Sequence, residues 1–212
     1  MTEAFSKLEP SKQKQILRAA LKEFAQHGYA QASTNTIVKE AGISKGMLFY
    51  YFTSKQDLFN YLVEYVLDHV EKGYLVHLDH HEPDFLARYS RSARIKMESY
   101  IKDGEIFEFL GALYLRQGDE PVEELLRARL DAMYQAAMEK MLDNVDSSLF
   151  RDDIPPEYVM KLTAWAMEGY QKELTDKLRG ANLSDLDMRK HWDDFYDFLA
   201  VLRTILYRQK EV

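Results

Sequence analysis

Apolar residues recur every three or four positions along almost the whole chain, which is the spacing of one face of an α-helix. A first apolar stripe follows Pro10 and stops at Gly28; its members are Ile16, Leu17, Ala20, Leu21, Phe24 and Ala25. Further helical patterns cover residues 34–42, 44–52 and 54–76. No run alternates between apolar and polar residues for long enough to predict a strand. The sequence therefore predicts an all-α protein.

The rest of the chain continues this pattern in longer segments. Helical spacing covers about 84–102, 105–116 and 121–149, after which Ile154-Pro155-Pro156 breaks the chain. Two long amphipathic segments follow, at about 156–179 and 184–208, with Gly180 and Ser184 as the stop and the start between them. We therefore expect about nine helices, with the polar stretch 77–83 dividing an N-terminal part from a larger helical bundle.

Residues 34–52, TNTIVKEAGISKGMLFYYF, predict two short helices joined by the turn Ala41-Gly42-Ile43. This is the helix-turn-helix arrangement, in which the second helix enters the major groove of DNA. Five apolar residues are placed to face inward and fix the crossing of the two helices: Ile37, Val38, Ala41, Ile43 and Leu48. We expect the other face to carry Thr34, Thr36, Lys45, Met47, Phe49, Tyr50 and Tyr51.

Two further features of this segment favour contact with DNA. Thr34 and Ser44 lie near helix N-termini, where free backbone N–H groups favour a phosphate. Gly46 lies in the first turn of the second helix, where a glycine costs about 1 kcal/mol relative to alanine. The missing side chain would allow close approach to a base edge or a phosphate.

The distribution of charge is compatible with this interpretation, although the net charge of the chain is −7. Residues 1–60 carry eight Lys and Arg against five Asp and Glu, a net charge of +3, and the remaining residues carry −10. A module that faces phosphates needs positive charge only locally. The absence of cysteine excludes disulfides, thiolate metal sites and cysteine nucleophiles.

The sequence shows no targeting segment. The first residues, MTEAFSKLEPSKQKQ, lack the apolar run of a signal peptide, and no window approaches the roughly 18 apolar residues of a membrane span. We expect a cytoplasmic protein.

Three segments, in their order and spacing, resemble the DNA-binding domain of the TetR family of repressors: KQKQILRAALKEFAQHGYAQAS, TNTIVKEAGISKGMLFYYF and SKQDLFNYLVEYV. The resemblance covers about the first sixty residues. It implies a homodimer on a palindromic operator, an inducer pocket in the C-terminal bundle, and release of DNA when the inducer binds. The expected domains are a helix-turn-helix domain at 1–54, a connecting helix at 55–76, and a ligand-binding and dimerisation domain at 77–212.

Carried onto this sequence, the resemblance implies DNA contacts at Thr34, Thr36, Lys45, Gly46, Tyr50, Tyr51 and Lys55. The positions of Ser44, Met47 and Phe49 in the same segment make them further candidate contacts. Phe49 departs from the pattern, because many members have tyrosine there; it still offers contact with a thymine methyl group. We expect Met47 to discriminate between bases.

The C-terminal part is rich in large apolar side chains, most of which any helical core would contain. Candidate lining residues for an apolar inducer are Tyr100, Phe107, Leu110, Tyr114, Tyr134, Met138, Trp165 and Tyr170, with Arg91, Arg94, Arg116 and Glu168 as candidate polar anchors. The last two helices can pair with those of a second copy as a four-helix bundle. Candidate dimerisation residues are Trp165, Leu174, Phe195, Phe198, Leu202 and Ile205.

Two other interpretations remain open. His77 and His81 have a spacing that suits two metal ligands on a helix, which would make a metal-responsive regulator, although a solvated linker explains the same polar stretch. A helical-bundle enzyme would need Glu-x-x-His pairs or a catalytic triad, and the sequence has neither. We therefore expect a regulator with no catalytic residues, no metal and no cofactor.

Overall fold

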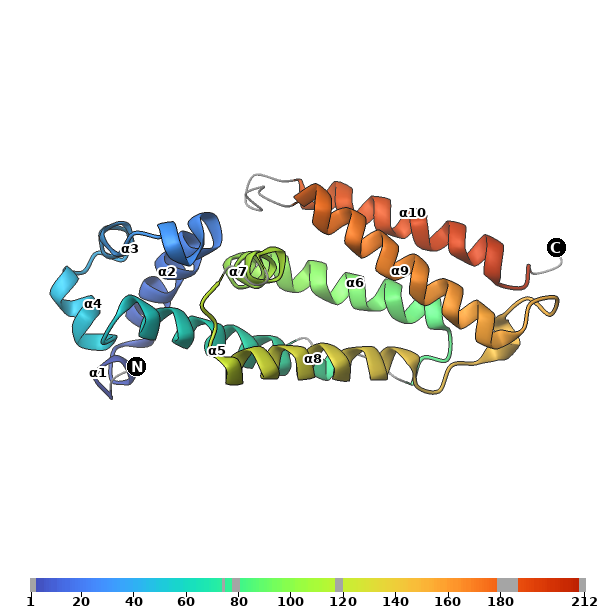
Figure 1. Cartoon of the computed structure of the whole chain (residues 1–212), viewed down its shortest axis with the longest axis horizontal. Coiled ribbons are helices and arrows are strands. Elements are labelled where there is room, and N and C mark those ends of the chain that lie inside the picture. Colours follow the sequence, from blue (N-terminus) through green and yellow to red (C-terminus); the bar gives the residue numbers. More distant parts are fainter. Residues whose placement is uncertain (1–2, 74, 78–80, 117–119, 179–186, 210–212) are drawn as a thin grey trace.

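The computed structural model describes residues 3–73, 75–77, 81–116, 120–178 and 187–209 of the 212-residue chain (Figure 1). The described residues form ten α-helices and two short 3₁₀ turns. They contain no β-strand, although Phe150 and Tyr207 form one isolated antiparallel bridge. The all-α prediction is confirmed. No helix in the described ranges is long and apolar enough to cross a membrane.

The N-terminal end of the molecule is built from four helices: α1 (Glu3–Ser6), α2 (Pro10–Gln31), α3 (Thr34–Glu40) and α4 (Lys45–Tyr51). The sequence pattern did not predict α1, which is too short to show helical spacing. Phe5 explains its position, because its ring is fully buried and packs against Phe52 at 4.9 Å and Tyr61 at 5.7 Å between ring centroids. A single aromatic anchor therefore fixes the first turn of the chain.

Helix α5 (Lys55–Gly73) leads from this end into the rest of the molecule (Figure 1). The predicted start at Ser54 is confirmed: its Oγ accepts the backbone N–H of Asp57 at 3.0 Å, and the Asp57 carboxylate accepts that of Thr53 at 2.9 Å. The helix ends at Gly73 instead of the predicted residue 76, and a 3₁₀ turn follows at Leu75–His77.

The C-terminal part contains α6 (Phe85–Lys102), α7 (Gly104–Leu115), α8 (Glu124–Leu142), a 3₁₀ turn at Ser147–Leu149, α9 (Pro156–Leu178) and α10 (Met188–Leu206). The predicted helix 121–149 is too long. Its real end is capped by Arg88, a 2% exposed residue of α6 that donates to the carbonyl oxygens of Met141 at 3.2 Å and Asn144 at 2.9 Å. The chain leaves helical geometry at Asp143, whose ψ is 141°, and Asn144 after it has a φ of 53°. Gly180 and Ser184 lie outside the described residues.

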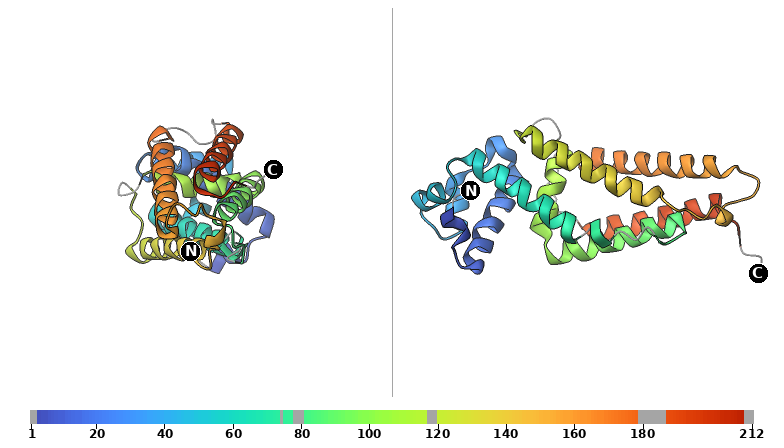
Figure 2. Two further views of the ribbon diagram at one scale, coloured as in Figure 1. Left: turned by 90° about the vertical axis from the view of Figure 1, so that its right-hand side faces the viewer. Right: turned by 90° about the horizontal axis from the view of Figure 1, so that it is seen from below.

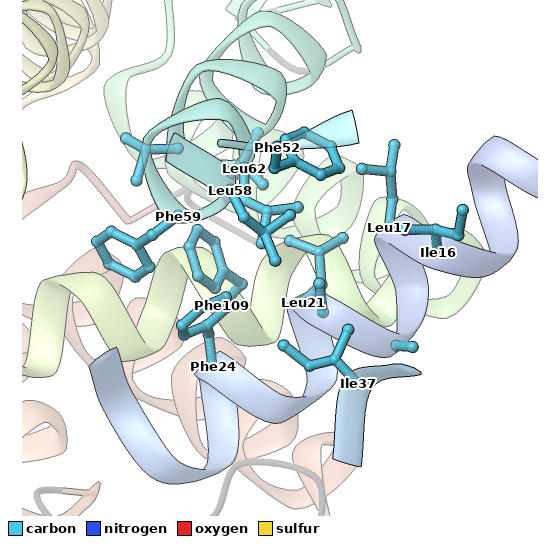
Figure 3. Close-up of a cluster of buried hydrophobic side chains, with 14 of the residues drawn as sticks. Ile16, Leu17, Leu21, Phe24, Ile37, Phe52, Leu58, Phe59, Leu62 and Phe109 are labelled. Carbon is cyan, nitrogen blue, oxygen red and sulfur yellow. The ribbon is translucent and has the colours of Figure 1, made fainter. Parts of the chain in front are cut away.

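The molecule is elongated, with α3 and α4 at one end and the start of α9 and the end of α10 at the other (Figures 1 and 2). One buried apolar cluster joins the N-terminal helices to α5 and α7. In it, Phe109 of α7 lies beside Phe24 of α2 and Phe59 of α5 (Figure 3). The predicted division at residue 54 stays a prediction, but this core crosses it.

A second buried cluster holds α6, α9 and α10 together. Its fully buried members include Phe85, Phe150 and Val159. The hydroxyl of Tyr207 accepts the backbone N–H of Leu86 at 3.1 Å, and burial raises the pKa of this phenol. The tail after α10 is thereby fixed to the start of α6.

Gly28 is the position where the fold depends most on the absence of a side chain. Its φ is +68°, and a Cβ there would lie 2.8 Å from Oε1 of Glu120. We expect Gly28→Ala to lower the free energy of unfolding by about 1–3 kcal/mol, because the backbone and the contact are both strained. Denaturant titration measures this loss. Gly73→Ala is the control, since a Cβ at Gly73 meets nothing within 4 Å; equal losses in both variants would contradict the assignment.

Candidate nucleic-acid interface

The turn between α3 and α4 is closed by two backbone hydrogen bonds that define a Schellman motif. The N–H of Gly42 donates to the carbonyl of Lys39 at 3.3 Å, and that of Ile43 donates to the carbonyl of Val38 at 3.0 Å. Gly42 has a φ of +59°, which the motif requires at this position. The angle between the two helices is therefore fixed by local backbone geometry.

Serine side chains begin both helices. The Oγ of Ser33 accepts the N–H of Thr36 at 3.4 Å, and the Oγ of Ser44 accepts the N–H of Met47 at 3.2 Å. Ser44 is thus the N-cap of α4. Its Oγ accepts this bond, so its hydroxyl hydrogen can still be donated to a phosphate, and a DNA contact by Ser44 stays a prediction.

The predicted inward face is confirmed, since Ile37, Ala41 and Leu48 are buried and Val38 and Ile43 pack partly buried against the same cluster. The predicted outward face is confirmed for Lys45, Met47, Phe49 and Tyr50, all of which are exposed, with Tyr50 the most at 67%. Gly46 is exposed beside them. Thr34 and Thr36, at the start of α3, are half-buried. One face of α4 therefore presents a cation and three large side chains to solvent.

Tyr51 is a correction to the predicted outward face. Its side chain is only 5% exposed, and its ring packs edge-on against Phe5 with 5.8 Å between centroids. The sequence pattern placed Tyr51 outside because it did not predict α1, whose Phe5 covers this side of α4. Tyr51 is a core residue that supports Tyr50, its neighbour at 5.8 Å between centroids.

Lys55 is half-buried at the start of α5. Its Nζ lies 4.8 Å from the centre of the Tyr29 ring and donates to the carbonyl oxygen of Ala30 at 3.4 Å. The side chain therefore joins α5 to the end of α2. A phosphate contact by Lys55 stays a prediction.

Two charged residues of α2 that the sequence pattern did not single out hold the helix-turn-helix in place. Lys12 donates through Nζ to the carbonyl oxygens of Ala41 at 2.9 Å and Gly42 at 3.3 Å, at the C-terminal end of α3. Glu23, 6% exposed, accepts the N–H of Ser33 at 2.7 Å, just before α3 begins. The partners lie up to 30 residues apart, so no local motif could have identified them.

Of the eight predicted inducer-lining residues, Tyr114 and Tyr134 lie close together, since burial and the neighbouring Tyr114 both raise the pKa of Tyr134; a cavity lined by all eight stays a prediction. Phe107 and Leu110 pack against the first apolar cluster, Tyr170 stacks on Phe198 at 4.8 Å, and Trp165 is 61% exposed on α9. Tyr114 and Tyr134 are also exposed, and Met138 is half-buried on α8. Tyr100 lines an open groove of about 680 Å³, whose other walls include Arg18, Lys22, Glu105 and Glu108. This groove is polar and does not match the expected apolar pocket.

Tyr89 of α6 is a candidate polar contact for a ligand at a position that is not among the eight predicted lining residues. Its hydroxyl is buried and has no hydrogen-bond partner among the described residues. Burial, with smaller contributions from Tyr134 of α8 and Glu168 of α9, raises the pKa of Tyr89 to about 12. An unpartnered hydroxyl between three helices is a feature that a bound molecule can satisfy.

The predicted dimerisation residues divide into exposed and internal ones. Trp165 and Ile205 are exposed, as are their neighbours on the same helices, namely Tyr158, Leu162 and Val201. Leu202 is a correction, because it is 8% exposed and belongs to the second buried cluster. Phe195 and Phe198 are half-buried around Tyr170, and Leu174 is half-buried on α9. The exposed apolar face of α9 and α10 therefore contains fewer residues than predicted. On α10 it includes Val201 in place of Leu202.

The histidine pair of the metal interpretation lies on both sides of residues 78–80, which are outside the described ranges. His77 ends the 3₁₀ turn after α5, so the pair does not continue that helix. Within the described part of the chain, no three His, Cys, Asp or Glu side chains are grouped to hold a metal.

Residues 16–62 match the model of a family described as bacterial regulatory proteins, tetR family. This range runs from the middle of α2 into α5 and contains the whole turn described above. This part of the chain is similar to the TetR family. The match covers its N-terminal end, and the C-terminal bundle lies outside it.

Two relatives show how far the TetR-family similarity extends along the sequence. The uncharacterised regulator YuxN of Bacillus subtilis is 46% identical over 57 residues, which is 27% of this chain but only 20% of that protein. The transcriptional repressor AcnR of Corynebacterium glutamicum is 24% identical over 177 residues, covering 81% of this chain and 86% of the repressor. High identity is thus confined to a short segment.

A solved structure extends the likeness of fold to the whole chain. It is a TetR-family transcriptional regulator from Chloroflexus aurantiacus, with a TM-score of 0.64 and 17% identity over 98% of this chain and 99% of that one. The combination of a helix-turn-helix and a helical bundle is therefore the shared fold.

We expect Lys12→Met to lower the free energy of unfolding by about 0.5–1 kcal/mol, because the C-terminal carbonyls of α3 lose their cation. Thermal or denaturant unfolding measures the loss. Lys14→Met is the matched control, because Lys14 is an exposed neighbour on the same helix. A loss of the same size in the control would remove Lys12 from this role.

Proposed function

We propose that the chain is a DNA-binding transcriptional regulator that places α4 in the major groove. The observation that carries this proposal is the exposed face of α4, held on a rigid turn and presenting Lys45, Met47, Phe49 and Tyr50. Large apolar side chains exposed together on a short helix are unusual without a partner. The match of residues 16–62 to a family described as regulatory proteins supports the same function.

Gly46 adds an independent argument for close approach to DNA. It lies exposed in the first turn of α4, and a Cβ there would meet only the Oγ of Ser44, at 3.9 Å. The described part of the protein therefore gives no internal reason for a glycine that costs the helix about 1 kcal/mol. Space for a partner outside the protein accounts for it.

The proposed contacts follow from these exposures. Lys45 and Tyr50 would reach phosphates, whereas Met47 and Phe49 would touch base edges or thymine methyl groups. Thr34, Thr36, Ser44, Gly46 and Lys55 lie around this face as secondary candidates. Tyr51 is left out because it is part of the core.

We propose that two copies bind one palindromic operator. The exposed apolar stripes of α9 and α10 are suited to pair with the same stripes of a second copy as a four-helix bundle. The two α4 helices would then lie about 34–36 Å apart, one turn of DNA. A twofold-symmetric protein matches a twofold-symmetric DNA sequence.

We propose repression that a small molecule relieves. The relative AcnR is named a repressor, which supports the first part. The unpartnered hydroxyl of Tyr89, with Tyr134 and Glu168 nearby, is the candidate ligand site in the bundle. A ligand there would act only through its different affinities for the DNA-bound and free conformations. The metal-responsive alternative would use His77 and His81 instead.

Selection of genomic DNA fragments by the purified protein tests the proposed function. Binding should concentrate on one palindromic sequence and should weaken steeply as the salt concentration rises. Recovery of fragments without a shared sequence would contradict the proposal. The genes beside the selected site would then indicate the class of ligand to add, and chelation of metal in the same assay tests the histidine alternative.

We expect Lys45→Ala to weaken binding to every DNA sequence and to lower the salt dependence of the affinity by about one unit, the share of one phosphate contact. Affinity measured at several salt concentrations gives this slope. Lys102→Ala, at the exposed end of α6, is the control for loss of one positive charge. An unchanged slope for Lys45→Ala would exclude a phosphate contact by this lysine.

We expect Trp165→Glu combined with Ile205→Glu to convert a dimer into monomers, because charges in an apolar interface lose their hydration. Sedimentation measures the assembly state. Leu125→Glu is the control, since Leu125 is an exposed apolar residue on α8. A dimer that survives the double change would show that another face holds the two copies.

A further inference from the structure

Helix α2 is interrupted at Gly28, whose φ of +68° and ψ of 171° lie far from helical values. In an unbroken helix the carbonyls of residues 24–26 would accept the N–H groups of residues 28–30. The non-helical geometry of Gly28 interrupts this regular pattern near the point where the chain enters the helix-turn-helix. Each freed group then needs another partner, because unpaired backbone groups are costly when buried.

Two charged residues that follow the C-terminal end of α7 supply hydrogen-bond partners for these backbone groups. Arg116, which follows α7, donates through Nη1 to the carbonyl oxygen of Ala25 at 3.0 Å and through Nη2 to that of Gln26 at 3.2 Å. Glu120 accepts the N–H of Tyr29 through Oε2 at 2.8 Å. A cation thus meets the freed carbonyls and an anion meets the freed amide, which matches the helix dipole on both sides of the kink.

The burial of these groups makes the arrangement specific. Glu120 is 9% exposed, and its Oε1 lies 3.9 Å from Nη1 of Arg116. A nearly buried carboxylate is costly unless it is paired, so Glu120 depends on both the Tyr29 amide and the Arg116 guanidinium. Arg116 was a candidate anchor for an inducer, but the structure commits its guanidinium to α2.

The connection from α7 to α8 also holds the start of α5. Gln56 donates through Nε2 to the carbonyl oxygen of Pro121 at 2.8 Å, and Asn60 donates through Nδ2 to Oε1 of Glu123 at 2.5 Å. In the sequence, α2 precedes the helix-turn-helix and α5 follows it. The described residues of this one connection therefore contact the segments on both sides of it.

The kink at Gly28 and the start of α3 are separated by a short segment of the chain. Tyr29 packs edge-on against Phe59 of α5 at 5.2 Å between centroids, and four residues later Ser33 caps α3. The Ser33 amide is held in turn by Glu23 of α2. The start of α3 is therefore joined to α2 on both sides of Gly28, through the turn that follows the kink and through Glu23 before it.

We propose that Arg116 and Glu120 are positioning residues for DNA binding, which complete the kink of α2 from the bundle side and so set the orientation of α3 and α4. The proposal rests on the proposed function for its DNA part. It also assigns the route by which the bundle controls the helix-turn-helix: displacement of the end of α7 removes the partners of the kink.

Hydrogen–deuterium exchange of the free protein tests the proposal without any DNA. Glu120→Ala should speed exchange of the Tyr29 amide on the order of tenfold, the effect of losing a hydrogen bond to a charged group. Arg116→Gln should speed exchange across residues 28–33. Glu98→Ala and Arg94→Gln, two exposed positions on α6, are the controls. Exchange in residues 28–33 equal to that of the controls would overturn the proposal.

Measurements of DNA binding distinguish a positioning role of Glu120 from direct contact between Glu120 and DNA. On a DNA site selected by the unaltered protein, Glu120→Ala should raise Kd on the order of tenfold with an unchanged salt slope, because no phosphate contact is lost. A changed slope would mean direct contact and would overturn the positioning role, as would an unchanged Kd. If the protein selects no DNA site, the proposed function fails, while the exchange result still decides the kink assignment.

The variant Glu120→Gln is a control for general unfolding caused by Glu120→Ala. Its amide oxygen can still accept the Tyr29 N–H but carries no charge for Arg116. Exchange of the Tyr29 amide should then be intermediate between the unaltered protein and Glu120→Ala. Exchange in Glu120→Gln as fast as in Glu120→Ala, with the melting temperature unchanged, would show that the hydrogen bond to Tyr29 is unimportant and would overturn this part of the proposal.

Discussion

Three aromatic rings from three helices form the contact on which the rest of the structure depends. Phe59 of α5 packs edge-on against Phe24 of α2 at 5.1 Å and against Phe109 of α7 at 5.7 Å. Burial of one such ring stabilises a fold by about 1.5–3 kcal/mol. Because the three helices belong to the N-terminal end, the connecting helix and the bundle, this contact joins all of them into one core (Figure 3).

Local patterns in the sequence were sufficient to predict the helix-turn-helix. They were insufficient to predict the long-range contacts that hold it against the rest of the protein. Gly42 and Ser44 specify their turn and cap through neighbours within five residues, so the pattern predicted both. Tyr51 was misplaced because its cover, Phe5, lies 46 residues away in a helix too short to show a period. The contacts of Arg116 span about 90 residues and leave no spacing to detect.

The position of a ligand site in the bundle was the least predictable feature, for a related physical reason. A helical spacing shows which residues avoid water, but it does not distinguish a residue that lines a cavity from one that fills a core. Trp165 lies on the outside and Tyr170 packs on a neighbouring ring, although both fit the same apolar pattern. Tyr89 differs by its buried unpartnered hydroxyl, and only the packing of α6 reveals that state.

The same core explains why a regulator of this design would need the polar contacts at the α2 kink. Apolar packing is nondirectional, so the Phe24–Phe59–Phe109 contact keeps α2, α5 and α7 together while leaving their relative rotation weakly specified. Hydrogen bonds are directional, and those of Arg116 and Glu120 to α2 allow one orientation. Loss of these bonds would therefore change the orientation of α3 and α4 without separating the helices, which is the kind of change that can switch DNA binding while the fold persists.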